Sequence, residues 1–196
     1  RLLGSTKKLT SNTEIGSVLR STKELNLESQ KINEAYFLAI NSMTSNTEAG
    51  SVLRYTLRNH KMNTNSWSQF FTITGRLTSN TTMGSVLSDA IDYLPLDDET
   101  IVDGFFLATS KFTSNTEHGR VLREMISSPA FNKYIAYKVL ESARKLSSNT
   151  EKGSVLVRLA DTEFVNDPTI KKLYMSTAKT LTSDSEYRRV VDKLID

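Results

Sequence analysis

A Ser-x-x-Glu helix-start signature recurs along the whole chain at almost constant spacing, and this repeat limits the possible folds more than any other feature. The repeat motifs begin near residues 10, 44, 78, 113, 147 and 182, and their serines are separated by 34, 34, 35, 34 and 35 residues. A fixed period of this length is typical of a solenoid, in which one supersecondary unit stacks on copies of itself. Because such units cannot bury their apolar faces alone, we expect residues 1–196 to form a single α-solenoid domain.

Each motif contains the residues of a capping box. In the best-formed copy Ser45 is the predicted N-cap, and its hydroxyl should accept the backbone N–H of Glu48. The Glu48 carboxylate should in turn accept the N–H of Ser45. Five of the six copies keep the Glu, and Thr82 replaces it in the third. The motif therefore starts a helix, and no ligand is needed to explain it.

Apolar residues at helical spacing predict two amphipathic helices in each repeat. The helix before each motif carries the row Tyr36, Phe70, Phe105, Val139 and Tyr174, beside Phe37, Phe71, Phe106, Leu140 and Met175. The helix that the motif starts carries the pairs Val18-Leu19, Val52-Leu53, Val86-Leu87, Val121-Leu122, Val155-Leu156 and Val190-Val191. We interpret these rows as core rather than as a platform for stacking bases. They predict an all-α, right-handed alpha-alpha superhelix of about six 34–35-residue helix hairpins, entered through a short helix at residues 1–9.

A glycine stands five residues after the cap serine in five copies, at Gly16, Gly50, Gly84, Gly119 and Gly153. Glycine inside a helix costs about 1 kcal/mol relative to Ala, so its recurrence requires a reason. We expect each glycine to allow close approach of the following repeat. The last copy has Arg188 at this position, where we expect no following repeat. On this hypothesis Gly84→Ala lowers the melting temperature.

Composition excludes several classes of site. Apolar residues make up 38% of the chain and charged residues 24%. The apolar runs are too short for a transmembrane helix. The absence of cysteine excludes disulfides and thiolate chemistry. The net charge of +3 is uneven, since residues 76–110 carry 1 basic and 6 acidic side chains. We interpret this acidic segment as a solvated face with helix-capping carboxylates. The chain begins at Arg1, so it is expected to be a trimmed product or a fragment of a larger protein.

No constellation of catalytic or metal-binding residues is present in the sequence. His60 and His118 are the only histidines, and neither has a second ligand at helical spacing. The acidic segment lacks the order of a calcium loop, and no Gly-rich phosphate loop or Gly-x-Ser-x-Gly motif occurs. We therefore predict no cofactor, no metal and no enzymatic activity.

One variable residue inside each constant motif is the candidate contact with a partner. These residues form a predicted partner-binding stripe of Ile15, Ala49, Met83, His118, Lys152 and Tyr187. Repeat proteins present different groups to a partner in this way, although the stripe could also be exposed and unconstrained. A second stripe begins with Arg20, Arg54 and Arg123, but Ser88, Val157 and Asp192 interrupt it, which argues against a continuous nucleic-acid-binding track.

The motif resembles a bacterial tandem helical repeat that reads Ser-Asp-x-Glu-x-x-x-Val-Leu. The most similar copy here is Ser183-Asp184-Ser185-Glu186-Tyr187-Arg188-Arg189-Val190-Val191. That repeat occurs in secreted or membrane-anchored proteins and in the extracytoplasmic part of some membrane sensor metallopeptidases that resemble beta-lactam receptors. The resemblance implies an all-α solenoid in an extracytoplasmic (periplasmic or secreted) place. The recurrent Asn after the Ser and the in-register Gly depart from the family pattern.

These observations lead to two functional expectations. The first is a non-enzymatic helical-repeat scaffold or binding module for a protein or peptide partner. The alternative is a nucleic-acid-binding helical-repeat array that uses the basic ends of the chain. The sequence leaves the oligomeric state and the identity of the partner open.

Overall fold

The computed structural model describes residues 9–22 and 25–194, and within these ranges all regular secondary structure is helical. The predicted short helix at residues 1–9 lies almost wholly outside the described residues. The chain divides into two compact units, unit 1 (Arg1–Pro95) and unit 2 (Leu96–Asp196). The sequence repeat continues through both, and the single domain expected from the sequence stays a prediction.

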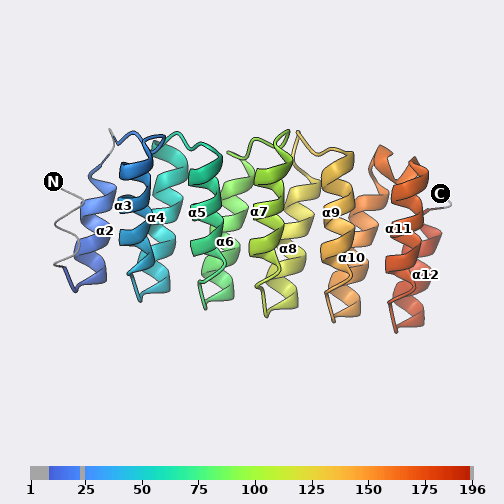
Figure 1. The fold of residues 1–196 in the computed structure, drawn as a ribbon. Coiled ribbons are helices and arrows are strands. Elements are labelled where there is room, and N and C mark those ends of the chain that lie inside the picture. Colours follow the sequence, from blue (N-terminus) through green and yellow to red (C-terminus); the bar gives the residue numbers. More distant parts are fainter. Residues whose placement is uncertain (1–8, 23–24, 195–196) are drawn as a thin grey trace. The chain divides into compact units, whose positions relative to one another are not determined.

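Unit 1 consists of stacked α-helices joined by short connections. They are α2 (Asn12–Arg20), α3 (Gln30–Asn41), α4 (Asn46–Asn59), α5 (Thr64–Thr74) and α6 (Asn80–Ile91). Helices α3 and α5 form one layer, and α2, α4 and α6 form the layer behind it (Figure 1). Each helix packs on its chain neighbour and on the next helix of its own layer, as in an array of helix hairpins.

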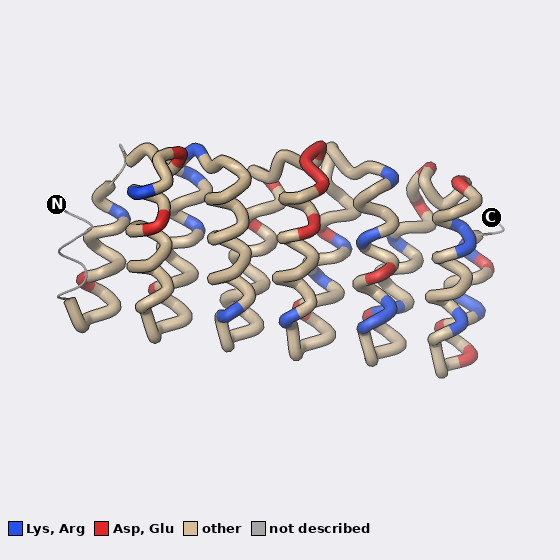
Figure 2. Tube along the Cα trace, viewed as in Figure 1, with Lys and Arg blue, Asp and Glu red and all other residues tan. Residues whose placement is uncertain are grey.

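Unit 2 repeats this arrangement. Its helices are α7 (Glu99–Thr109), α8 (Asn115–Ile126), α9 (Lys133–Ala143), α10 (Asn149–Ala160), the 3₁₀ turn η2 (Glu163–Asn166), α11 (Pro168–Ala178) and α12 (Asp184–Asp192). Helices α7, α9 and α11 form the first layer, and α8, α10 and α12 the second (Figure 1). Charged residues occur on both layers of each unit (Figure 2). No described helix is long and apolar enough to span a membrane.

The predicted apolar rows form the core of each unit. The first-layer row of Tyr36, Phe70, Phe105, Val139 and Tyr174 is fully buried. The Val-Leu pairs of α4, α6, α8 and α10 are fully buried as well. Only the ends of the rows reach the surface, because Val18, Met175 and Val191 are partly exposed. The rows are therefore core, as the helical periodicity predicted.

Only half of the predicted capping box forms. Each cap serine accepts the N–H of the residue three positions later, for example Ser45 Oγ from Glu48 N at 3.3 Å. The return bond from Glu48 to the Ser45 N–H is not made, so that part of the prediction is wrong. The Ser45 N–H instead donates to Asn12 Oδ1 of the preceding repeat at 3.1 Å.

This asparagine is the first residue of every second-layer helix except α12, which begins at Asp184, and it joins successive repeats. Asn12 Oδ1 also accepts the N–H of Thr44 at 2.8 Å, and its amide donates to Thr44 Oγ1 at 3.0 Å. Asn46 makes the same three bonds to Thr78 and Ser79, and Asn115 makes them to Ser147 and Ser148. Asn149 makes two of them to Thr182. The recurrent Asn is thus a hydrogen-bonding ladder between repeats.

Four of the five recurrent glycines, Gly16, Gly50, Gly119 and Gly153, lie where the following repeat comes close, as predicted. Close approach at Gly84 stays a prediction. A Cβ added to Gly16 or Gly119 would lie 2.5 Å from Oε2 of Glu48 or Glu151, the capping-box Glu of the next repeat. At Gly50 the Cβ would meet the methyl group of Thr82, and at Gly153 it would meet the carboxylate of Glu186. These contacts are shorter than real Cβ atoms show, so a larger residue would force its neighbour to shift. At Gly50 that neighbour is the short, β-branched Thr82, whereas at the other three positions it is the end of a flexible Glu side chain.

Candidate partner-binding surface

The predicted partner-binding stripe lies in the interior, so the expectation that it is exposed is wrong. Ile15, Ala49, Met83, His118 and Lys152 are buried, with 1–6% of each residue exposed, and Tyr187 is half-buried. The stripe residue is the fourth residue of its helix, a position where a side chain packs against the chain that enters the helix. The variation of this residue among the repeats therefore reflects packing in the core, and these side chains do not form a surface for a partner.

Two polar members of the stripe show how the core accommodates variation. The His118 ring stacks on Phe112, which lies just before the same helix, with ring centroids 5.6 Å apart. His118 Nε2 lies 2.7 Å from Ser142 Oγ. Lys152 Nζ donates to Thr180 Oγ1 at 2.8 Å. Each of these two buried polar groups thus has a hydroxyl partner, in α9 for His118 and just after α11 for Lys152, as burial requires.

The two histidines are structural. Burial, together with the nearby charge of Lys145, lowers the pKa of His118 to about 4. Burial also lowers the pKa of His60, and the backbone of Leu25 offsets this lowering only in part. Both rings are buried, and no group of three His, Asp or Glu side chains able to hold a metal ion occurs within residues 9–22 and 25–194.

The arginines of the second stripe form ion pairs between repeats. Arg20 pairs with Glu48 at 3.0 Å, and Arg123 pairs with Glu151 at 2.7 Å. The third repeat has Thr82 in place of the Glu, and Arg54 pairs instead with Asp89 at 2.8 Å. The arginines of this second stripe therefore form ion pairs within their own units.

Acidic residues of the segment 76–110 include a helix cap, as interpreted from the sequence, and others form ion pairs that the sequence did not predict. In unit 1 Asp89 also accepts from Arg58 at 2.7 Å. In unit 2 Asp98 accepts the N–H groups of Thr100 and Ile101 at the start of α7. Asp103 pairs with Lys138 at 2.7 Å. The bonds from Lys138 and Tyr134 lower the pKa of Asp103.

The most distinctive exposed feature is on the first layer of unit 2, where a cleft of about 340 Å³ lies between α7 and α9. Phe106 and Ser142, both buried, lie at its base. Leu107 stands on its rim and is 65% exposed. A large apolar side chain this exposed on an ordered helix is a candidate contact for a partner.

Charge is unevenly divided along this cleft. At one end Lys138 lies between Asp103 and Glu141, with Nζ–O distances of 2.7 and 3.9 Å. At the other end Lys145 is exposed and makes no ion pair with any described residue. Further cations, Lys111, Arg144 and Lys179, are exposed at the same ends of the first-layer helices of unit 2 (Figure 2). The free charge at this end of the cleft is therefore positive.

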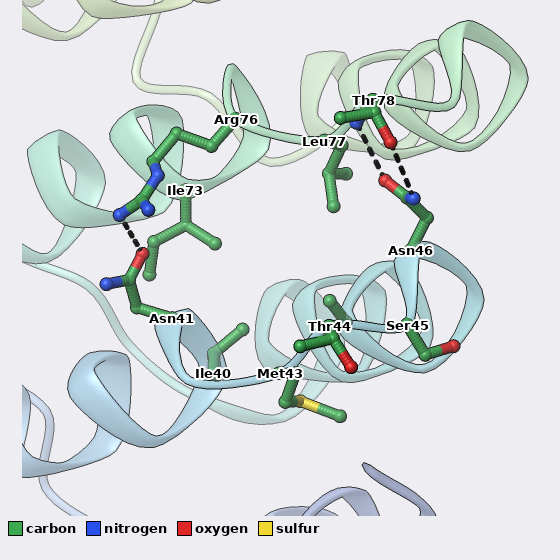
Figure 3. Close-up of a pocket in the computed structure, with 11 residues that line it drawn as sticks. Ile40, Asn41, Met43, Thr44, Ser45, Asn46, Ile73, Arg76, Leu77 and Thr78 are labelled. Atoms are coloured by element: carbon green, nitrogen blue, oxygen red, sulfur yellow. Dashed lines mark hydrogen bonds between the residues drawn. The ribbon is translucent and has the colours of Figure 1, made fainter.

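Unit 1 has residues of similar kind at the corresponding sequence positions of α3 and α5. Leu38, two repeats before Leu107, is 56% exposed. The exposed Arg76 occupies the position of Lys145, and its Nη1 donates to Asn41 Oδ1 at 2.5 Å. Beside this bond lies a pocket of about 120 Å³ into which Ile40, Ile73 and Leu77 point (Figure 3). Ala49 lines this pocket.

Sequence reasoning missed these surface residues. Leu38 and Leu107 stand in the row of first-layer residues that should be polar, together with Thr72, Glu141 and Ser176. The available signal was an apolar residue at an exposed position of an amphipathic helix that recurs two repeats later.

Comparison of the chain with protein-family models, curated proteins and solved structures finds no match.

Proposed function

We propose that this chain is a non-enzymatic helical-repeat scaffold that holds a protein or peptide partner on its first-layer helices. The proposal includes a right-handed superhelix of about six helix hairpins and an extracytoplasmic place, both of which rest on the repeat motif and its resemblance to the bacterial family. The observation that carries the function is the cleft between α7 and α9 with Leu107 exposed on its rim. The cleft combines the apolar side chains of Phe106 and Leu107 with polar and charged groups along its walls, so it suits a partner segment that carries both apolar and charged side chains.

The test compares recovery of partners from the native host. The wild-type chain and the variant Leu38→Gln/Leu107→Gln serve as bait, because Gln keeps helix propensity while removing apolar surface. Tyr93→Gln is the control, since Tyr93 is 46% exposed but lies in the connection after α6 and not on a first-layer helix. A partner retained by wild type and Tyr93→Gln but lost by the double variant supports the proposal. Equal recovery by all three baits contradicts it.

A nucleic-acid-binding array is the second candidate, favoured by the exposed cations Lys111, Arg144, Lys145 and Lys179 of unit 2. Cations near helix C-termini also stabilise the helix dipole without any ligand. Nucleic-acid binding weakens steeply with salt. Retention of the chain on DNA or heparin that is lost at high salt would support this function, and the absence of retention at low salt would exclude it.

A further inference from the structure

Both units place the same pair of side chains at the same position of their first layer. Leu38 and Leu107 are the two most exposed large apolar side chains of the described residues, at 56% and 65%. The following first-layer helix ends beside each of them with an exposed cation, Arg76 in unit 1 and Lys145 in unit 2. The two pairs are two repeats apart in the sequence.

In unit 2 the leucine and the cation line one cleft, and in unit 1 the cation is bonded one helical turn from the leucine. In unit 1 Arg76 bonds to Asn41, which is one helical turn after Leu38 on the same face of α3. In unit 2 Leu107 and Lys145 line the same cleft, together with Ser110 at the position of Asn41. Phe37 and Phe106, which precede the two leucines in the sequence, are both buried.

The charges of both sites are free to meet a partner. Arg76 makes one hydrogen bond to a neutral amide and no ion pair with a described residue. Lys145 is likewise unpaired, whereas Lys138 in the same cleft is neutralised by Asp103 and Glu141. An anion is therefore attracted to the Lys145 end, and an apolar group to the Leu107 rim. A carboxylate on Arg or Lys forms a charge-assisted bond.

From this repeated geometry we propose that each unit binds a short extended segment of a protein partner that carries an apolar residue next to a carboxylate. The apolar residue covers Leu38 or Leu107, and the carboxylate pairs with Arg76 or Lys145. This inference rests on the proposed function and adds the chemistry of the partner.

The test uses the full chain and a defined probe, a synthetic peptide in which Leu alternates with Glu between Gly ends. Methyl NMR signals of Leu38 and Leu107 report the two sites separately during titration. We expect both leucines to shift and saturate. Replacing Glu by Lys, or Leu by Ser, in the peptide should weaken binding by about tenfold or more, as expected for loss of one charged or apolar contact. Lys145→Glu should abolish the shift at Leu107 and keep that at Leu38, and Arg76→Glu should do the reverse.

Several outcomes would overturn the inference. These are the absence of peptide-induced shifts at both leucines, equal binding of the Lys-containing peptide, or shifts caused by a single-stranded oligonucleotide but not by the peptide. A host partner that depends on Leu38 and Leu107 but binds equally to Arg76→Glu and Lys145→Glu would contradict the carboxylate while leaving the proposed function in place. Loss of dependence on the leucines themselves would remove the proposed function.

Discussion

At the scale of single residues, His118 makes the stability of unit 2 depend on pH. Its pKa is about 4 in the folded protein and 6.5 in an exposed chain. Between these values the unfolded state binds more protons than the folded state, so the free energy of unfolding is highest above about pH 6.5 and decreases as pH falls toward 4. The shift is worth on the order of 3 kcal/mol. We expect thermal melting between pH 7 and 4 to show this loss.

His118→Gln is the matched variant, because Gln can still bond Ser142 but does not titrate. Its melting temperature should fall less steeply between pH 6.5 and 4 than that of wild type. His60, whose pKa is lowered in the same direction, accounts for part of the remaining slope. An unchanged slope in His118→Gln would contradict a neutral, buried His118.

Gly50 is the residue at which close helix packing is tested most directly. Ala at this position gains about 1 kcal/mol of helix propensity, but its Cβ would meet the β-branched Thr82 of the next repeat. Overpacking of this kind costs about 1–3 kcal/mol. We therefore expect Gly50→Ala to lower the melting temperature of the chain, despite its better propensity.

The companion variant Thr82→Ala removes the methyl group that the new Cβ would meet. In Gly50→Ala/Thr82→Ala we expect the stability to recover to at least that of Thr82→Ala alone, a coupling that a double-mutant cycle measures. If Gly50→Ala is as stable as wild type, or if Thr82→Ala gives no rescue, close approach is not the reason for the glycine.

At the scale of helices and their connections, the asparagine ladder couples one repeat to the next. Asn115 Oδ1 accepts the N–H groups of Ser147 at 2.8 Å and Ser148 at 3.2 Å. Asn115→Ala leaves both donors without this acceptor, and we expect a loss of about 1–2 kcal/mol in chemical denaturation. Asn115→Asp keeps the acceptor oxygen and loses only the donor to Ser147 Oγ, so it should cost less. Equal losses in the two variants would contradict the role of the acceptor.

The helices show which features a sequence reveals and which it does not. The rows of Phe70 and Val86 and the cap at Ser45 depend on residues close in the chain, and helical periodicity predicts them. The return bond of Glu48 fails because a third group, Asn12 of the preceding repeat, occupies the Ser45 N–H. The burial of the stripe also depends on contacts that the sequence does not reveal. Whether Ala49 is covered depends on the path of the connection that leads into its own helix, α4.

At the scale of the whole molecule, contacts between nearest neighbours hold each unit together. Within unit 2, α10 packs on α8 and α12, and α9 packs on α7 and α11. In such an array stability is approximately a sum of repeat terms and interface terms. Weakening one interface should therefore lower the local stability most in the repeat that has the fewest other interfaces. A repeat with a single neighbour loses its only interface.

Asn149 allows this to be tested, because its two bonds to Thr182 link α10 to the connection before α12. In Asn149→Ala we expect native-state hydrogen exchange of α11 and α12 amides to accelerate by about tenfold, equivalent to about 1.4 kcal/mol of lost coupling. Exchange in α7 should change little, and unit 1 provides the internal reference. Equal acceleration throughout α7–α12 would mean that unit 2 unfolds as one cooperative block, in which case the asparagine ladder would stabilise the unit as a whole rather than one interface.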